Sequence, residues 1–273
     1  MPSEARLGGL TLRARDLRAM RAFYADLLGL AEVVGPEAIQ FHSRHMTLEI
    51  RQDPQSQPPG SPVLGLYHLA LRLPDRAALA RIVRRLLEAG YPHWEGASDH
   101  GFSEALYLRD PEGNGVELYA DRPWTEWPRR DGRLWGFTRP LDVDSLLRAS
   151  RRSAPLPPET ELGHIHLHVP DLEEAEAFFS GLLGLHVTIR DYPGARFFAA
   201  GHYHHHIGTN TWVRNPAPDN ATGLLGYRWR IPHDALKALE AHLRARRVDF
   251  TRTQDGIIQL RDPLGHGVSC EPA

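Results

Sequence analysis

The chain has 273 residues, of which 24% are charged and 41% apolar, a composition typical of a globular protein large enough for two domains. Its 32 Lys and Arg residues nearly balance 34 Asp and Glu residues and are scattered, which excludes a basic stripe for nucleic acid. No apolar run approaches the ~20 residues that cross a bilayer, and the N-terminus lacks the apolar stretch of a signal peptide, so we expect a cytoplasmic protein without a membrane partner.

Cysteine content restricts the kinds of metal site that the chain can build. Cys270 is its single cysteine, which excludes an intrachain disulfide and zinc sites made of several thiolates. The sequence holds 16 histidines. Any metal site is therefore expected to use imidazole and carboxylate ligands.

Two internal repeats divide the chain into units. Residues 8–30, GGLTLRARDLRAMRAFYADLLGL, are matched by residues 163–185, GHIHLHVPDLEEAEAFFSGLLGL. YLRDPEGNGVEL, from Tyr107, is matched by QLRDPLGHGVSC, from Gln259. Self-similarity at this scale predicts four units of about 50 residues. We name them A, B, A′ and B′; they begin near Gly8, Gly65, Gly163 and Gly223.

Each unit opens with an alternating run that predicts a strand, such as HLALRL from His68. An amphipathic helix follows. In unit B, Leu79, Val83 and Leu86 form its apolar stripe and Gly90 ends it, and in unit A′ the helix has Asp171 at its N-cap.

Strands complete each unit. EALYLRD and GVELYAD flank the turn PEGN and predict a β-hairpin. The sequence therefore predicts an α+β fold of four βαβββ modules that pair into two cup-like half-barrels.

The chain is expected to fall into two halves joined by a long connection. Residues 1–121 hold the N-terminal pair of modules and residues 161–273 the C-terminal pair. Residues 122–160 are rich in proline and arginine and show little periodicity, so they predict a linker with one short helix near Val143 to Ala149.

Three candidate metal ligands stand at related positions in the units. His68 and His164 each lie seven residues before the aspartate at a strand-to-helix junction, where units A and B′ have Gly9 and Gly226. Glu117 lies on the last strand of unit B, and the corresponding residue of B′ is Ser269.

Two histidines and one carboxylate leave three coordination positions open, which suits Fe(II) that binds a chelating substrate together with O2, and Mn(II) can use the same ligands. A strand histidine that is only hydrogen-bonded and a strand glutamate that is only solvated are the alternative interpretation. Because the ligands come from B and A′, we expect these two units to share one cup. Units A and B′ then form a second cup without metal.

Further polar residues are candidates for chemistry near this set. HYHHH, residues 202–206, is predicted to lie on a strand of A′, so that only alternate members face the site. Tyr107 shares a face with Glu117 if the hairpin brings the two strands together. His100 lies in a polar segment and is equally explained as a loop residue.

Tryptophans in the linker also invite two interpretations. Trp124, Trp127 and Trp135 could cover an aromatic substrate. Packing beneath a long connection explains them as well, and we favour packing.

These residues resemble the vicinal-oxygen-chelate superfamily, which includes glyoxalase, bleomycin-resistance and extradiol-dioxygenase proteins. The motifs GLYH, HIHLHV, YHHHIG and HGFSEALYLRDPEGNGVE are similar to those of its catechol-2,3-dioxygenase type. The resemblance implies that His68, Glu117 and His164 bind the metal, that Tyr107 is an active-site tyrosine and that His100 contacts substrate. It implies that His205 is the acid/base histidine. A shift of one residue in the alignment would instead assign this role to His204 or His206.

The resemblance implies an Fe(II)-dependent enzyme that opens the ring of a small aromatic diol with O2. The sequence leaves the oligomeric state undetermined, and a homo-oligomer is one alternative. Two other functions also stay open. One is a glyoxalase-like lyase or isomerase, which needs a fourth protein ligand and usually Zn or Ni. The other is a non-catalytic protein that sequesters a small molecule.

Overall fold

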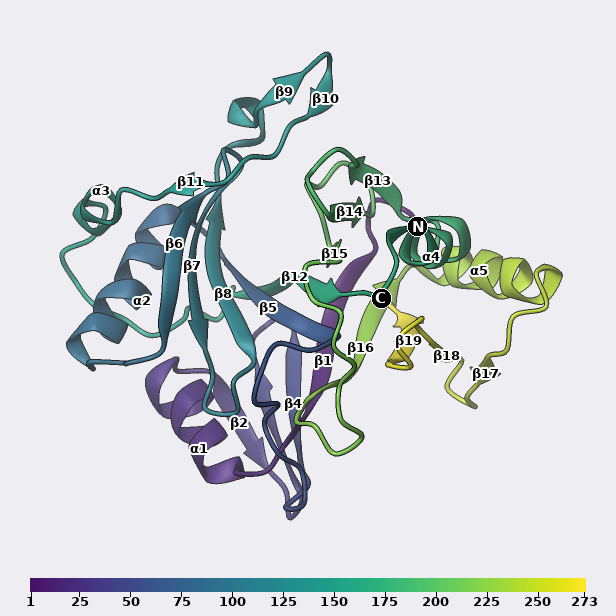
Figure 1. Cartoon of the computed structure of the whole chain (residues 1–273), viewed down its shortest axis with the longest axis horizontal. Coiled ribbons are helices and arrows are strands. Elements are labelled where there is room, and N and C mark those ends of the chain that lie inside the picture. The colour runs from purple at the N-terminus through teal and green to yellow at the C-terminus, as the bar shows by residue number, and fades with distance from the viewer.

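The computed structural model describes residues 1–273 and contains the four predicted βαβββ units (Figure 1). Unit A comprises β1 (Arg6–Ala14), α1 (Leu17–Arg21) with a π-helical continuation (Ala22–Leu27), β2 (Ala31–Val34), β3 (Ala38–His42) and β4 (Thr47–Gln52). Unit B comprises β5 (Gly65–Leu73), α2 (Arg76–Glu88), β6 (Trp94–Asp99), β7 (Ser103–Arg109) and β8 (Gly115–Asp121).

The second half of the chain repeats the pattern. Unit A′ comprises β12 (Glu161–His168), α4 (Leu172–Glu176) with a π-helical continuation (Ala177–Leu182), β13 (His186–Ile189), β14 (Ala195–Ala199) and β15 (Ile207–Asn210). Unit B′ comprises β16 (Gly223–Ile231), α5 (His233–Ala245), β17 (Thr251–Arg252), β18 (Ile258–Arg261) and β19 (Gly267–Pro272).

Two mixed sheets organise the molecule, and each takes strands from both halves of the chain. One has the order β17-β18-β19-β16-β1-β4-β3-β2 and joins units A and B′. The other has the order β11-β6-β7-β8-β5-β12-β15-β14-β13 and joins units B and A′. In both, the first strands of two units meet antiparallel at the centre, as β5 and β12 do (Figure 1). The predicted pairing of B with A′ is confirmed.

The helices form where the sequence predicts them. Asp16, Asp75 and Asp171 each accept hydrogen bonds from backbone N–H groups of the following first turn, which satisfies donors that a helix start leaves unpaired. In α2 the predicted apolar stripe is fully buried, and Gly90 follows the helix with φ +62°, a conformation that favours glycine.

The hairpin of β7 and β8 is also confirmed. Asp110 caps its turn, because its carboxylate accepts hydrogen bonds from the backbone N–H groups of Glu112 and Asn114. The two strands pair without a bulge, and Tyr107 lies opposite Glu117. This register places both side chains on the same face of the sheet.

The connection between the halves is more structured than its sequence predicts. It contains the expected helix, α3 (Val143–Arg148), and in addition a 3₁₀ turn (Trp124–Glu126) and a two-stranded hairpin of β9 (Arg129–Arg130) and β10 (Arg133–Leu134). Strand β11 (Arg139–Pro140) pairs with the edge strand β6. The connection thereby reaches the rim of the B/A′ sheet.

One predicted strand is wrong. Residues 202–206, HYHHH, form a turn between β14 and β15. Gly201 has φ +59°, and a Cβ atom there would lie 2.8 Å from Ser3, so the chain reverses where only glycine fits. Because the segment is a turn, its side chains do not alternate between two faces as those of a strand do, and each can enter different surroundings.

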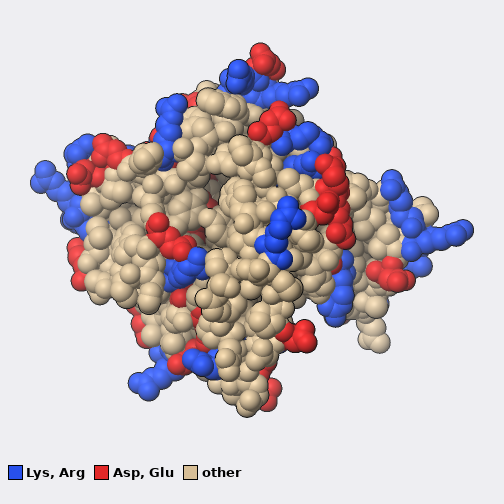
Figure 2. Space-filling view, in the orientation of Figure 1, with Lys and Arg blue, Asp and Glu red and all other residues tan.

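No helix of the structure has both the length and the apolar character to span a membrane. On the face shown in Figure 2, acidic and basic side chains are interspersed, and the surface is hollowed near its centre.

Candidate active site and metal centre

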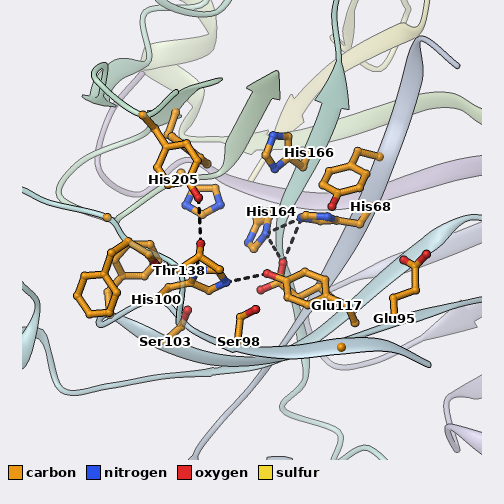
Figure 3. Close-up of a pocket in the computed structure, with 18 of the residues that line it drawn as sticks. His68, Glu95, Ser98, His100, Ser103, Glu117, Thr138, His164, His166 and His205 are labelled. Atoms are coloured by element: carbon orange, nitrogen blue, oxygen red, sulfur yellow. Dashed lines mark hydrogen bonds and ion pairs between the residues drawn. The ribbon is translucent and has the colours of Figure 1, made fainter. Parts of the chain in front are cut away.

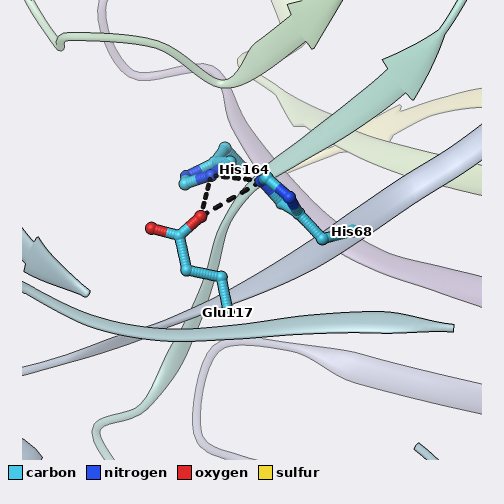
Figure 4. A group of neighbouring side chains, drawn as sticks. All are labelled: His68, Glu117 and His164. Carbon is cyan, nitrogen blue, oxygen red and sulfur yellow. Dashed lines mark hydrogen bonds and ion pairs between the residues drawn. The ribbon is translucent and has the colours of Figure 1, made fainter. Parts of the chain in front are cut away.

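Three side chains converge at the centre of the B/A′ sheet (Figure 4). His68 lies on β5, Glu117 on the adjacent β8 and His164 on the adjacent β12. The Nε2 atoms of the two histidines are 3.3 Å apart, and Glu117 Oε2 lies 3.1 Å from His68 Nε2 and 3.0 Å from His164 Nε2. All three side chains are buried. The sheet therefore brings the predicted ligand set together.

The spacing of these donors fits a divalent cation. An octahedral ion that binds three donors at about 2.1 Å on one face holds them about 3.0 Å apart. The measured triangle is close to that value, and the donor set of two imidazoles and one carboxylate is the facial set that leaves three positions free.

Electrostatics at the set favour a cation as well. Burial opposes ionisation of Glu117, but His164 and His68 hold its pKa well below the usual range. Burial also lowers the pKa of His164 to about 4, so this ring is neutral near pH 7. One buried carboxylate thus lies beside a neutral imidazole, and their potential ligand atoms, Oε2 and Nε2, are 3.0 Å apart.

The ligand rings are oriented by packing. The Nδ1 atoms of His68 and His164 are buried and have no hydrogen-bond partner. Aromatic neighbours hold the rings instead, with Tyr67 at 4.7 Å from His68 and Tyr119 at 5.0 Å from His164 between ring centroids. Polar contacts of both imidazoles are therefore confined to Nε2, on the side that the three residues share.

A cavity of about 510 Å³ opens onto the three side chains (Figure 3). Apolar and aromatic side chains form much of its wall, among them Phe102, Ile189, Tyr192 and Phe197. Because such a wall repels water and packs against flat rings, the cavity is suited to an aromatic ligand.

Tyr107 and His100 lie together in the cavity wall (Figure 3 shows His100). The Tyr107 hydroxyl is 2.8 Å from His100 Nε2, and His100 Nδ1 is 3.1 Å from the Phe137 carbonyl oxygen. A carbonyl only accepts, so Nδ1 carries a proton and donates it. Burial lowers the pKa of His100, so Nε2 of the neutral ring accepts from the Tyr107 hydroxyl. Burial and then the charge of Glu117 raise the pKa of Tyr107, which keeps this hydroxyl protonated.

The three consecutive histidines of the 202–206 turn face three different surroundings. His205 lines the cavity, with its ring centroid 4.2 Å from that of His164. His204 is completely buried and its Nε2 contacts Asp121 at 2.9 Å. His206 lines a separate cavity behind the sheet. Of the three alternatives that the sequence left open, His205 is the one at the cavity.

Sequence reasoning did not single out some residues of the cavity wall. His166 lies on the same face of β12 as His164, its ring centroid is 5.1 Å from that of His68, and its Nε2 accepts a hydrogen bond from the Asn210 amide. The alternating run HIHLHV carried this signal. Phe137 and Thr138 come from the connection, whose lack of periodicity gave no signal.

The linker tryptophans stay outside this cavity, as the packing interpretation predicts for Trp127. Trp127 is buried beside Phe102. Trp124 and Trp135 are about half exposed, at 53% and 43%.

The A/B′ sheet has different residues at the equivalent positions. Gly9 and Gly226 stand where the ligand histidines stand in the B/A′ sheet, and Ser269 stands in place of Glu117. A Cβ atom on Gly9 would lie 2.1 Å from the Thr47 carbonyl oxygen, and one on Gly226 would lie 2.5 Å from that of Gly267. Neighbouring backbone therefore leaves no room for an imidazole on either strand.

Comparison with known proteins agrees with this architecture. The chain is 40% identical over 274 residues to a catechol-2,3-dioxygenase of Bacillus subtilis, covering 96% of this chain and 95% of that protein. Over 121 residues it is 31% identical to a biphenyl-2,3-diol 1,2-dioxygenase of Rhodococcus globerulus, covering 42% of this chain and 63% of that protein.

Solved structures support the fold. Glyoxalase I from Zea mays superposes with a TM-score of 0.58 at 14% identity, covering 98% of this chain and 92% of that chain. A Bacillus subtilis crystal structure gives a TM-score of 0.64 at 14% identity, covering 98% and 86%. The model of the Glyoxalase/Bleomycin resistance protein/Dioxygenase superfamily matches residues 6–118 and 161–269. The chain belongs to this superfamily.

Proposed function

We propose that the protein is an extradiol ring-cleaving dioxygenase that opens a catechol-type aromatic diol with O2. The observation that carries this proposal is the buried triangle of His68, Glu117 and His164 at the base of an aromatic-walled cavity. The 40% identity to a catechol-2,3-dioxygenase over nearly the whole chain supports the same reaction.

The three side chains would hold Fe(II), with Mn(II) as an alternative ion. Bound there, the ion would supply adjacent open positions for both oxygens of the diol and for O2, and would pass electrons between them. Three protein ligands leave those positions free. A glyoxalase-type reaction needs a fourth, and no further imidazole or carboxylate joins this group.

His205 is the residue that we assign to proton transfer. Its Nδ1 faces His204, and its Nε2 makes no hydrogen bond to protein, so Nε2 is the atom available on the cavity side. Burial lowers the pKa of His205 well below its usual range, which leaves a neutral ring with a lone pair. A neutral imidazole near the metal can accept a proton from a diol hydroxyl.

Tyr107 and His100 form the second polar element of the cavity. Because the Tyr107 hydroxyl donates its hydrogen bond to His100 Nε2, the free lone pairs of the Tyr107 oxygen face the substrate. They can accept a hydrogen bond from a diol hydroxyl. As the diol loses its protons, the same pair can reorient and donate to the developing negative oxygen. Tyr107 and His100 therefore orient the diol.

Cavity size indicates the class of diol. Pockets of ~300–1,000 Å³ hold drug-sized ligands, so a volume of about 510 Å³ exceeds what a bare catechol ring fills. The surplus lies beside apolar side chains that include Ile189 and Phe197. We propose a catechol with an apolar ring substituent.

The proposal is tested with protein purified without oxygen. Metal content is measured first, and oxygen uptake is then followed with catechol, 4-methylcatechol and phenyl-substituted catechols under added Fe(II). We expect about one iron per chain, one O2 consumed per diol and a ring-opened semialdehyde, as extradiol cleavage requires. Thiohemiacetal isomerisation with Zn or Ni, or tight diol binding that survives His68→Ala without turnover, would contradict it.

A further inference from the structure

A chain of hydrogen bonds leads from Asp121 to the side chain that we assign to proton transfer. Asp121 is the last residue of β8, and its Oδ1 atom is 2.9 Å from His204 Nε2. His204 Nδ1 lies 2.8 Å from His205 Nδ1. Both histidines are buried, and the ring of His204 is stacked on Phe102 at 4.5 Å. Water therefore does not interrupt the chain.

These contacts determine which nitrogen carries each proton. A carboxylate only accepts, so His204 Nε2 carries a proton and donates it to Asp121. With that single proton on the His204 ring, Nδ1 has a lone pair. Two nitrogens 2.8 Å apart need one proton between them, so His205 Nδ1 carries it and donates. His205 Nε2 is left with a lone pair on the cavity side.

Asp121 is itself held in place from its other side. Its Oδ2 accepts from the Tyr203 hydroxyl at 2.9 Å and from the Arg72 guanidinium at 3.3 Å. Tyr203 and Arg72 line the second cavity, behind the sheet. Burial would raise the pKa of Asp121, but the His204 imidazole and the Arg72 guanidinium lower it below its usual range. The carboxylate therefore stays ionised.

We propose that Asp121 is a positioning residue, which acts through His204 to fix His205 in the tautomer that presents the Nε2 lone pair to the diol. The assignment rests on the proposed role of His205 in the ring-cleavage reaction. Neither Asp121 nor His204 lines the cavity, so neither touches the substrate.

The arrangement also provides for the proton that His205 receives. When the diol O–H breaks and a proton binds Nε2, the Nδ1 proton of His205 can pass to His204 Nδ1 along the existing hydrogen bond. His205 then stays neutral, and the positive charge lies on His204 beside the Asp121 carboxylate. This keeps a cationic ring away from a bound metal ion, where repulsion would disfavour it.

Asp121→Asn is the informative substitution, because Arg72 dictates how the new amide lies. The guanidinium only donates, so the amide oxygen faces Arg72 and the NH2 group faces His204 Nε2. His204 must then carry its proton on Nδ1 and donate to His205 Nδ1. The chain is inverted, and the proton of His205 moves to Nε2, where it occupies the lone pair.

Imidazole ¹⁵N NMR of the full-length protein, metal-free and with Zn²⁺ added, measures the tautomer directly, with the His205 signals assigned by their loss in His205→Gln. We expect Nδ1–H in the wild type and Nε2–H in Asp121→Asn. The control His206→Gln replaces the neighbouring histidine that faces the other cavity and should leave His205 unchanged. An Nδ1–H tautomer in Asp121→Asn, or Nε2–H in the wild type, overturns the proposal.

A second variant guards against misfolding. His204→Phe keeps the aromatic stack on Phe102 and removes the acceptor of the His205 proton. We expect His205 to lose its single tautomer, and a His205 that keeps only Nδ1–H contradicts the proposal.

Kinetics provide an independent readout. In the iron-loaded enzyme, Asp121→Asn should lower kcat by ~100-fold or more with little change in metal content or KM. An unchanged kcat in a variant with the inverted tautomer overturns the positioning role. If the wild type shows no ring cleavage, the proposed function fails, whereas the NMR result still decides how His205 is held.

Discussion

Tyr107 and Glu117 lie directly opposite each other across the hairpin of β7 and β8. One strand residue of a single hairpin thus supplies the carboxylate of the metal triangle, and its partner supplies the hydroxyl that bonds His100. Because a strand alternates its faces, a shift of one residue in this pairing would turn one of the two side chains away. The capped turn at Asp110 therefore fixes the geometry of the site as well as the fold.

The hydroxyl of Tyr107 can be tested by Tyr107→Phe. The change leaves the ring in place and removes the donor to His100 Nε2, so kcat/KM for the diol should fall on the order of 100-fold, with metal content unchanged. Oxygen uptake and metal analysis measure the two effects. Tyr91→Phe, which loses a hydroxyl bonded to the Arg109 carbonyl at a tyrosine that does not line the cavity, should keep full activity. Equal losses in both variants would refute a role for the Tyr107 hydroxyl.

The carboxylate of the triangle can be tested by Glu117→Gln. The amide keeps the shape of the side chain but removes the negative charge that favours a divalent cation. Loss of a residue that only supports a metal ligand weakens metal binding by up to ~100-fold, so loss of a ligand itself should weaken it at least ~100-fold. Titration of metal-free protein measures this affinity. Glu271→Gln alters a carboxylate on β19 of the A/B′ sheet, paired with Arg230, and should bind metal normally. Retention of metal by Glu117→Gln would remove that residue from the ligand set.

Metal-free protein should lose stability in mild acid through its buried histidines. Burial lowers the pKa of His164 to about 4, against 6.5 in an unfolded chain. Between these two pKa values the unfolded state binds a proton and the folded state does not. The free energy of unfolding is therefore unaffected above pH 6.5 and decreases as pH falls toward 4, by about 3 to 4 kcal/mol at most.

Urea unfolding of wild type and His164→Gln at several pH values isolates this effect. Asp110, whose pKa is raised to about 6 by burial, works in the opposite direction, because it favours folding as pH falls through 6. Asp110 is present in both proteins, so their difference cancels it. We expect the stability of the wild type to fall more steeply below pH 6.5 than that of His164→Gln. Parallel curves would show that His164 titrates normally.

Substrate breadth should depend on Ile189. This side chain lines the cavity and contacts the aromatic cluster around Phe102. Ile189→Ala enlarges the cavity, so the ratio of kcat/KM for a phenyl-substituted catechol to that for catechol should rise about 10-fold or more, since a single methylene in an apolar pocket is worth at least about that factor. Ile258→Ala, in the core of the A/B′ sheet, should leave the ratio unchanged. A ratio that does not move would place the ring substituent elsewhere.

Much of the architecture could be predicted because sequence repeats and short motifs indicate it. The repeats predict four units, and Gly9, Gly226 and Ser269 in units A and B′ predict that the ligands come from B and A′. Tyr107 could be placed opposite Glu117 because the hairpin turn has a clear sequence signature.

The remaining parts of the site depend on contacts between distant segments. HYHHH was predicted as a strand because its turn depends on Gly201 packing against Ser3, and His204 is buried because Asp121, far away in sequence, satisfies it. Phe137 and Thr138 reach the cavity through the pairing of β11 with β6, which no periodicity in the connection indicates.

The antiparallel junction of β5 and β12 has a consequence for biosynthesis. When the ribosome has made only the first 160 residues, β5 lacks the neighbour that covers its free edge, and one imidazole of the triangle does not yet exist. Strand pairs so distant along the chain form late and slowly. The triangle should therefore bind a metal ion only after unit A′ has been synthesised and β12 has paired with β5.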